Sequence, residues 1–166
     1  ALTYLSDENE LKPECVVVTP NNYNYQKIGG DLSKRDSAIY VPIELTKGKS
    51  LTFEDIIISM DGSVGRVGTG YEGAYSTGIR KCNIINDAIN PEFLYYTLKS
   101  KNIQSTILAH ASGATILHAS SSIEYMRFAL PTPSILERFS DLVSPILQEI
   151  QKHKRRVLAL EKMKKV

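Results

Sequence analysis

The sequence predicts an α+β protein in which a mixed α/β globular domain, residues 1–133, is followed by a long helix of the coiled-coil type, residues 134–166. Two observations support this division. Up to residue 133, short apolar runs are separated by glycine, proline and polar clusters, a pattern typical of strands and loops. From residue 134 onward there is no glycine, and apolar residues recur at steps of four and three, which indicates a helix with one apolar face.

Several short strands and one helix are expected in the globular part. The strongest strand prediction is residues 55–60, DIIISM, and the other predicted strands are residues 16–19, 38–43, about 78–85 and 126–130. Asn90-Pro91-Glu92 predicts a helix start, with an N-cap side chain, a proline at the first helical position and an acid near the positive helix end. That helix is expected to continue to about Leu108. Residues 1–14 and 21–37 are polar and predict loops.

The apolar positions of the long helix form a heptad seam of about three repeats. Pro145 interrupts this pattern, although Ser144-Pro145 can begin a restarted helix. A single helix leaves such a seam in water, so we expect a second copy of the chain to cover it in a homodimer. The predicted dimerisation residues are Phe139, Val143, Ile146, Ile150, His153, Val157 and Leu160.

Composition and charge narrow the class of protein without identifying it. The net charge is +2 and the sequence pI is about 8.5, below the range of a strongly basic nucleic-acid binder. Residues 134–166 carry a net charge of +4 and residues 1–133 a net charge of −2. No apolar run is long enough to cross a membrane, and two cysteines suggest a reducing compartment, so the cytoplasm is the expected location.

The glycine-rich stretch GSVGRVGTGYEG, residues 62–73, contains the letters of a dinucleotide-binding signature at residues 68–73. That signature requires a helix directly after the loop, whereas turn and strand are expected here. The same requirement excludes a nucleophile elbow at residues 74–78. His110 and His118 lack the spacing of a metal pair or a catalytic triad. We therefore expect turns at these glycines, and no catalytic residue, metal site or cofactor.

The expected loops are rich in side chains that bind nucleic acid. Arg and Lys can contact phosphates or guanine edges, and Asn can read adenine. The clustering of such residues in long loops suggests a DNA-binding surface, in which Arg66 is the foremost candidate. The predicted DNA-binding residues are Tyr23, Tyr25, Lys27, Lys34, Arg35, Lys47, Lys49, Arg66, Tyr71, Tyr75, Arg80, His110, Thr115 and His118.

Five stretches of the sequence, in this order, resemble the specificity subunit of type I restriction–modification enzymes. They are EDIIISMDGSVGRVG (54–68), GAYSTGIRK (73–81), PEFLYYTLKS (91–100), ASGATILHAS (111–120) and FALPTPSILERFSDLVSPILQEI (128–150). Each stretch alone is a weak signal, and their combination is specific. The residues before Asp55 are the part in which such subunits vary.

The resemblance implies a protein that recognises DNA and does no catalysis. In this family, each target recognition domain reads one half of a split double-stranded DNA site. Long antiparallel helices set the spacing of the half-sites and dock the modification (methyltransferase) subunit, and through it the restriction subunit. Methyl transfer from S-adenosylmethionine and ATP-driven cleavage belong to those partners.

This chain departs from the family pattern, because full-length members usually have two recognition domains and two helical regions. It corresponds to a half subunit or to a fragment, with one domain and one helix. A different class of function remains open. In that alternative the chain is a protein–protein adaptor that uses its long helix and does not read DNA.

Overall fold

The computed structural model describes residues 16–18, 39–40, 49–75 and 78–163, and it contains two small sheets and three α-helices in that part of the chain. The strand order is β2-β1-β6-β3 in one sheet and β5-β4-β7 in the other. The strands are β1 (Val16–Val18), β2 (Ile39–Tyr40), β3 (Ser50–Leu51), β4 (Ile56–Ser59), β5 (Val67–Gly68), β6 (Gly73–Tyr75) and β7 (Ile79–Cys82). The helices are α2 (Pro91–Lys99), α3 (Lys101–Ala109), the 3-10 helix η5 (Ser120–Tyr125) and α4 (Pro133–Met163).

Strand β4 is the centre of the second sheet, as its run of isoleucines predicts. It pairs antiparallel with β5 and with β7, and all four of its residues are buried. Alternate side chains of a strand point to opposite faces, so β4 contributes side chains to two apolar clusters. Ile56, Ile58 and Met60 belong to the larger cluster with residues of α2, α3 and α4, and Ile57 belongs to the smaller one. The two faces explain why the run is apolar without alternation.

The single helix predicted after Asn90 is two helices, α2 and α3, separated at Ser100. Ser100 has extended backbone angles, and its hydroxyl accepts a hydrogen bond from the amide of Ile103, so it is the N-cap of α3. Asn90 stands at the N-cap position of α2 without a capping side-chain hydrogen bond. Its side-chain amide instead donates to the hydroxyl of Ser140 on α4. A serine inside an apparently continuous pattern was therefore the start of a second helix.

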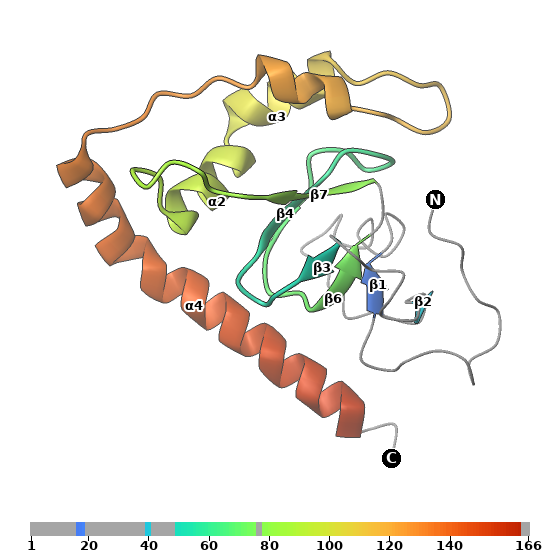
Figure 1. Ribbon diagram of the computed structural model, residues 1–166, viewed down its shortest axis with the longest axis vertical. Helices are drawn as coiled ribbons and strands as arrows, with labels where there is room; N and C mark the ends of the chain where they lie inside the picture. Colours follow the sequence, from blue (N-terminus) through green and yellow to red (C-terminus); the bar gives the residue numbers. More distant parts are fainter. Residues whose placement is uncertain (1–15, 19–38, 41–48, 76–77, 164–166) are drawn as a thin grey trace.

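The strand predicted at residues 126–130 is wrong, because these residues are extended but pair with no strand in the described part of the chain. They connect η5 to α4 along one edge of the molecule (Figure 1). Within this connection, the ring of Phe128 packs edge-on against the ring of Phe93 of α2, with 5.9 Å between the ring centroids. The stretch thus contributes an aromatic side chain to the packing of α2 without forming a strand.

Helix α4 is long, as predicted, and it packs against the globular part. It runs diagonally beside α2 and the second sheet (Figure 1). Leu136 and Leu147 are buried, and Phe139 is edge-on to Phe93 at 6.4 Å and to Tyr96 at 6.2 Å. The helix passes through Pro145 without a restart. Among the described residues, no helix combines the length and apolarity needed to cross a membrane.

Candidate nucleic-acid interface

The glycine-rich segment forms the turns between β4, β5 and β6, as the sequence predicts. Its first turn closes on Ser59 at the end of β4. The amide of Gly65 donates to the carbonyl of Ser59 at 2.8 Å, and the amide of Arg66 donates to the Ser59 hydroxyl at 3.0 Å. These bonds fix the backbone of Arg66, the foremost candidate for DNA contact.

Gln104 of α3 ties this turn to the helices. Its side-chain amide donates to the carbonyl of Gly65 at 2.8 Å and to the carbonyl of Leu98 at 2.7 Å. Gly65 has a φ of +79°, and a Cβ atom there would lie 2.5 Å from the Gln104 Oε1. Glycine is therefore favoured by the backbone angle, and a larger residue there would also displace the amide of Gln104.

The next turn of the glycine segment contacts α4. The side-chain amide of Gln151 donates to the Thr69 hydroxyl at 3.0 Å, and Nζ of Lys154 donates to the Thr69 carbonyl at 2.6 Å. The Lys154 ammonium also lies 4.0 Å from the centre of the Tyr71 ring. A Cβ atom at Gly70, whose φ is +80°, would lie 2.8 Å from Cδ of Lys154. We refer to the bonds of Gln151 and Lys154 with Thr69 as the Thr69–α4 contacts.

A groove of about 690 Å³ lies between the glycine segment and the three helices, and we call it the Arg66 groove. Its charged side chains are Arg66, Lys99 and Lys154, and no acidic residue is among the described residues that line it. It is lined by residues 64–68, by Tyr95 and Lys99 of α2, by Gln104 and Leu108 of α3, and by Ile150 and Lys154 of α4.

A second group of residues, which includes the predicted Arg80 and His118, lies just beyond the same end of β4, where the loop between α3 and η5 returns to the sheet. His118 lies 2.9 Å from a carboxylate oxygen of Asp61, and the guanidinium of Arg80 donates to the hydroxyl of Ser120 at 2.9 Å. The backbone pairs there too, since the amide of Gly62 donates to the carbonyl of Leu117 at 2.8 Å. We call Asp61, Arg80, His118 and Ser120 the His118 cluster.

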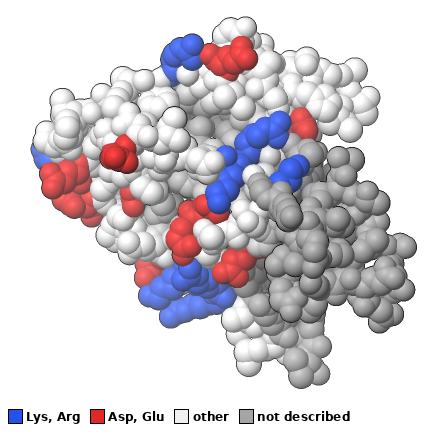
Figure 2. Space-filling view, viewed as in Figure 1, with Lys and Arg blue, Asp and Glu red and all other residues white. Residues whose placement is uncertain are grey.

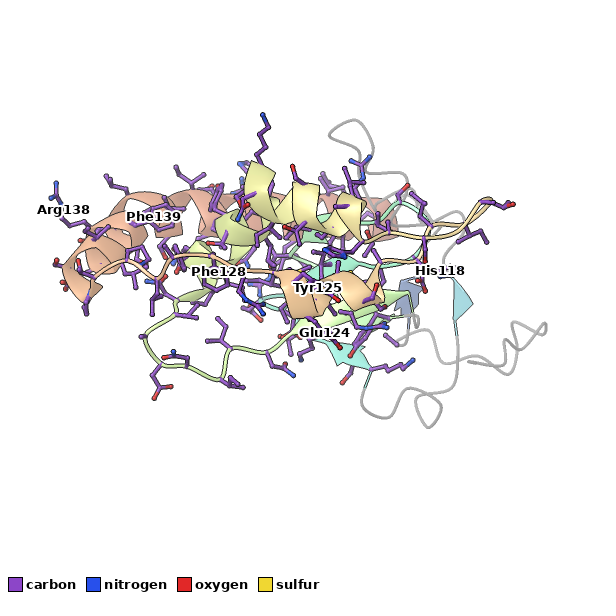
Figure 3. All side chains as sticks on the ribbon, turned by 90° about the horizontal axis from the view of Figure 1, so that it is seen from above. His118, Glu124, Tyr125, Phe128, Arg138 and Phe139 are labelled. Atoms are coloured by element: carbon purple, nitrogen blue, oxygen red, sulfur yellow. The ribbon has the colours of Figure 1, made fainter. Side chains whose placement is uncertain are left out.

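His110 and Thr115 belong to the same exposed loop as His118. The His110 ring stacks on Tyr125 at 3.9 Å with an angle of 5° between the ring planes. Figure 3 shows His118 and Phe139 toward opposite ends of the molecule, so this loop is remote from the start of α4. The loop presents polar side chains together with the exposed Ile116 and Leu117.

The predicted DNA-binding residues therefore separate into different places. Arg66 lines the groove on the β5 side of β4, Arg80 is on β7 on the other side of β4, and His110, Thr115 and His118 are in the loop between α3 and η5. Tyr71 is 5% exposed and packs in the smaller apolar cluster, where it supports Lys154. Lys49 and Tyr75 stand side by side, with the amide of Tyr75 donating to the carbonyl of Lys49 at 3.0 Å. Tyr23, Tyr25, Lys27, Lys34, Arg35 and Lys47 lie outside the described residues.

The predicted dimerisation seam is divided by the packing of α4. Phe139, Val143 and Ile150 are half-buried on the side toward the globular part, whereas Ile146, His153, Val157 and Leu160 are exposed. Ile135 and Leu142, absent from the predicted seam, are 56% and 74% exposed. The outward apolar stripe therefore consists of Ile135, Leu142, Ile146 and Leu160, with His153 between the last two.

The sequence did not indicate Lys99, Gln104, Gln151 or Lys154 as site residues. A signal for two of them was present, because Leu136, Leu147, Gln151 and Lys154 lie on one helix face, at successive spacings of eleven, four and three residues. Two polar residues that continue a buried stripe indicate polar contacts with the neighbouring element. For Lys99 and Gln104 there was no such signal, because the residues of the glycine segment that line the groove with them, 64–68, lie more than 30 residues earlier in the sequence.

Two properties of the described side chains bear on nucleophilic chemistry and on metal binding. Burial raises the pKa of the Cys82 thiol to about 11, so its nucleophilic thiolate is scarce at neutral pH. Among residues 49–75 and 78–163, no group of three or more His, Cys, Asp or Glu side chains is arranged to hold a metal ion. The surface in Figure 2 mixes acidic and basic side chains, with a basic group over the C-terminal half of α4.

Comparisons with known proteins identify the family of this chain and a similar solved structure. The model of the family described as "Type I restriction modification DNA specificity domain" matches residues 3–160. The chain is similar to the S subunit of a type I restriction-modification system from M. genitalium, with 18% sequence identity and a TM-score of 0.47. That match covers 92% of this chain and 39% of the S subunit, so this chain spans well under half of its length. No curated protein gives a significant match.

Proposed function

The chain belongs to the family of type I restriction-modification DNA specificity domains, and from that premise we propose that it reads one half of a two-part DNA target and docks a methyltransferase subunit. The observation that carries the proposal is the family match, which extends over residues 3–160 and so includes the glycine segment, the loop of the His118 cluster and nearly all of α4. In this proposal residues 1–133 are the recognition domain and residues 134–166 the spacer and docking helix.

The surface proposed for reading DNA is the exposed loop with His110, Thr115 and His118, which offers hydrogen-bonding and apolar groups of the kind that read base edges. Arg80 supports the loop, because its bond to Ser120 joins β7 to the first residue of η5. We assign no catalytic step to the chain, and methyl transfer and cleavage fall to the partner subunits.

We further propose that a second copy covers the outward stripe of α4. Ile135, Leu142, Ile146 and Leu160 are each more than half exposed, and full burial of such a side chain is worth roughly 1.5–3 kcal/mol. Residues 133–149 hold three acids and one arginine, whereas residues 150–163 hold five basic residues and one glutamate. An antiparallel pair brings acidic halves against basic halves. The proposed assembly is thus an antiparallel homodimer with a recognition domain at each end.

The proposal is tested by expressing the chain with its modification subunit in a host that lacks this system and mapping methylated bases in the genome. Two copies related by a two-fold axis present the same surface twice, so the expected motif has two identical half-sites in opposite orientation. The Leu142→Asp/Ile146→Asp double variant is expected to abolish methylation. Gln148→Asp, the same type of change on α4 away from the stripe, is expected to retain it.

A binding measurement separates the adaptor hypothesis from this proposal. The purified chain is incubated with a pool of random duplexes, and bound DNA is sequenced after repeated selection. Enrichment of one half-site supports DNA reading. A chain that binds the modification subunit but enriches no sequence is an adaptor, and the proposal is then wrong.

A further inference from the structure

The Arg66 groove gathers three positive side chains from three separate elements. Arg66 comes from the turn before β5, Lys99 from the last turn of α2, and Lys154 from the C-terminal half of α4. These residues are far apart in sequence, so the fold alone brings them to one groove. Like charges in one groove repel one another and favour an anionic occupant.

The groove is held in shape by bonds that do not involve an occupant. Ser59 holds the backbone of Arg66, and Gln104 joins the turn to the end of α2. Lys154 is held by the Thr69 carbonyl and the Tyr71 ring. Lys99 lies 3.4 Å from the Tyr95 hydroxyl and 4.8 Å from the centre of that ring. An anion that enters finds its cations already positioned, which lowers the entropic cost of binding.

We propose that the Arg66 groove binds the phosphate backbone of DNA, with Lys99 and Lys154 as phosphate contacts beside Arg66. The inference rests on the proposed function and adds a site to it. Phosphate is the fitting class of ligand because ammonium and guanidinium groups together surround it with charged donors. DNA is favoured over a free phosphate compound because the chain belongs to the family of DNA specificity domains.

The proposal gives α4 a direct role in DNA binding. A phosphate in the groove contacts the glycine segment, α2 and α4 at the same time. Contacts of this kind fix the position of the duplex and carry no base preference. Arg66 then positions the DNA, and base reading falls to the loop of the His118 cluster.

The test compares Lys99→Gln with Lys101→Gln by fluorescence anisotropy on a labelled duplex at several salt concentrations. Both lysines are exposed and two residues apart, but only Lys99 lines the groove. Lys99→Gln is expected to raise Kd about three- to tenfold at low salt and to reduce the slope of log Kd against log salt by about one. Lys101→Gln is expected to change Kd by less than about twofold.

The outcomes separate this inference from the proposed function. If the wild-type chain binds duplex and both variants bind equally well, the groove is not a phosphate site and the proposed function stands. If the wild-type chain binds no duplex, the proposed function fails and the inference with it. A parallel thermal melt with inorganic phosphate tests the other source. If phosphate raises the melting temperature of the wild-type chain but not of Lys99→Gln, while both bind the duplex with the same Kd, the groove binds a free phosphate compound. That result would overturn the DNA assignment.

Discussion

The N-terminal half of α4, residues 133–149, packs on α2 largely through apolar and aromatic side chains, whereas residues 150–163 meet the globular part through polar ones. Leu136, Phe139 and Leu147 carry the first contact. Gln151 and Lys154 carry the second, through the Thr69–α4 contacts. Apolar packing is strong but tolerates rotation, and hydrogen bonds are weaker but directional. The first half attaches the helix, and the second sets its direction.

The largest expected effect comes from the apolar half. Leu147 is 5% exposed and packs in the larger apolar cluster, so Leu147→Ala is expected to lower the free energy of unfolding by about 2–5 kcal/mol through lost burial and a cavity. Leu142→Ala, at a position 74% exposed, serves as the control and is expected to cost less than about 0.5 kcal/mol in the monomer. Urea denaturation followed by circular dichroism measures both. Equal costs would show that α4 is not attached where the structure has it.

A smaller effect is expected at Gly70, where α4 approaches the turn. In Gly70→Ala the positive φ is strained, and the new Cβ meets Cδ of Lys154 and the Phe53 ring. We expect a loss of about 1–3 kcal/mol in the free energy of unfolding.

The same substitution made in a Lys154→Ala background separates the two causes, because only the steric part depends on Lys154. A coupling energy near zero between the two positions would contradict the close approach of α4.

The smallest effect is expected for one hydrogen bond of the polar half. Thr69→Val removes the hydroxyl that accepts from Gln151 and makes only long contacts, at 3.5 Å, with the carbonyls of Phe53 and Glu54, and we expect a loss of about 1 kcal/mol in unfolding free energy. The control is Thr106→Val, whose hydroxyl bonds only to the Asn102 carbonyl in its own helix.

Hydrogen exchange gives a second measurement for this pair. Exchange is expected to rise in residues 150–163 and to stay unchanged in residues 133–149 for Thr69→Val. A uniform rise along α4 would show that the two halves are not distinct.

The same contrast explains what could be predicted from the sequence. Strand β4 and helix α4 were predictable because composition and periodicity are local properties. The face of α4 that is buried could not be predicted. Apolar residues at steps of three and four form two adjacent stripes on this helix, and only the position of α2 decides which stripe is buried. Ser100 was missed because a serine inside a helical pattern is common, and only its extended backbone reveals an N-cap. The turns at the glycines were predictable, but the partners of Gly65 and Thr69 lie 39 and 82–85 residues away.

The contacts that hold the glycine segment have a consequence for how such a protein can change. The side chain of Gln104 donates a hydrogen bond to the carbonyl of Gly65, and that of Lys154 donates one to the carbonyl of Thr69. A backbone carbonyl is present whatever side chain the residue carries, so these bonds constrain the path of the chain and leave most of its side chains free to vary. Side chains of the glycine segment can therefore change while its two turns keep their bonds to α3 and α4.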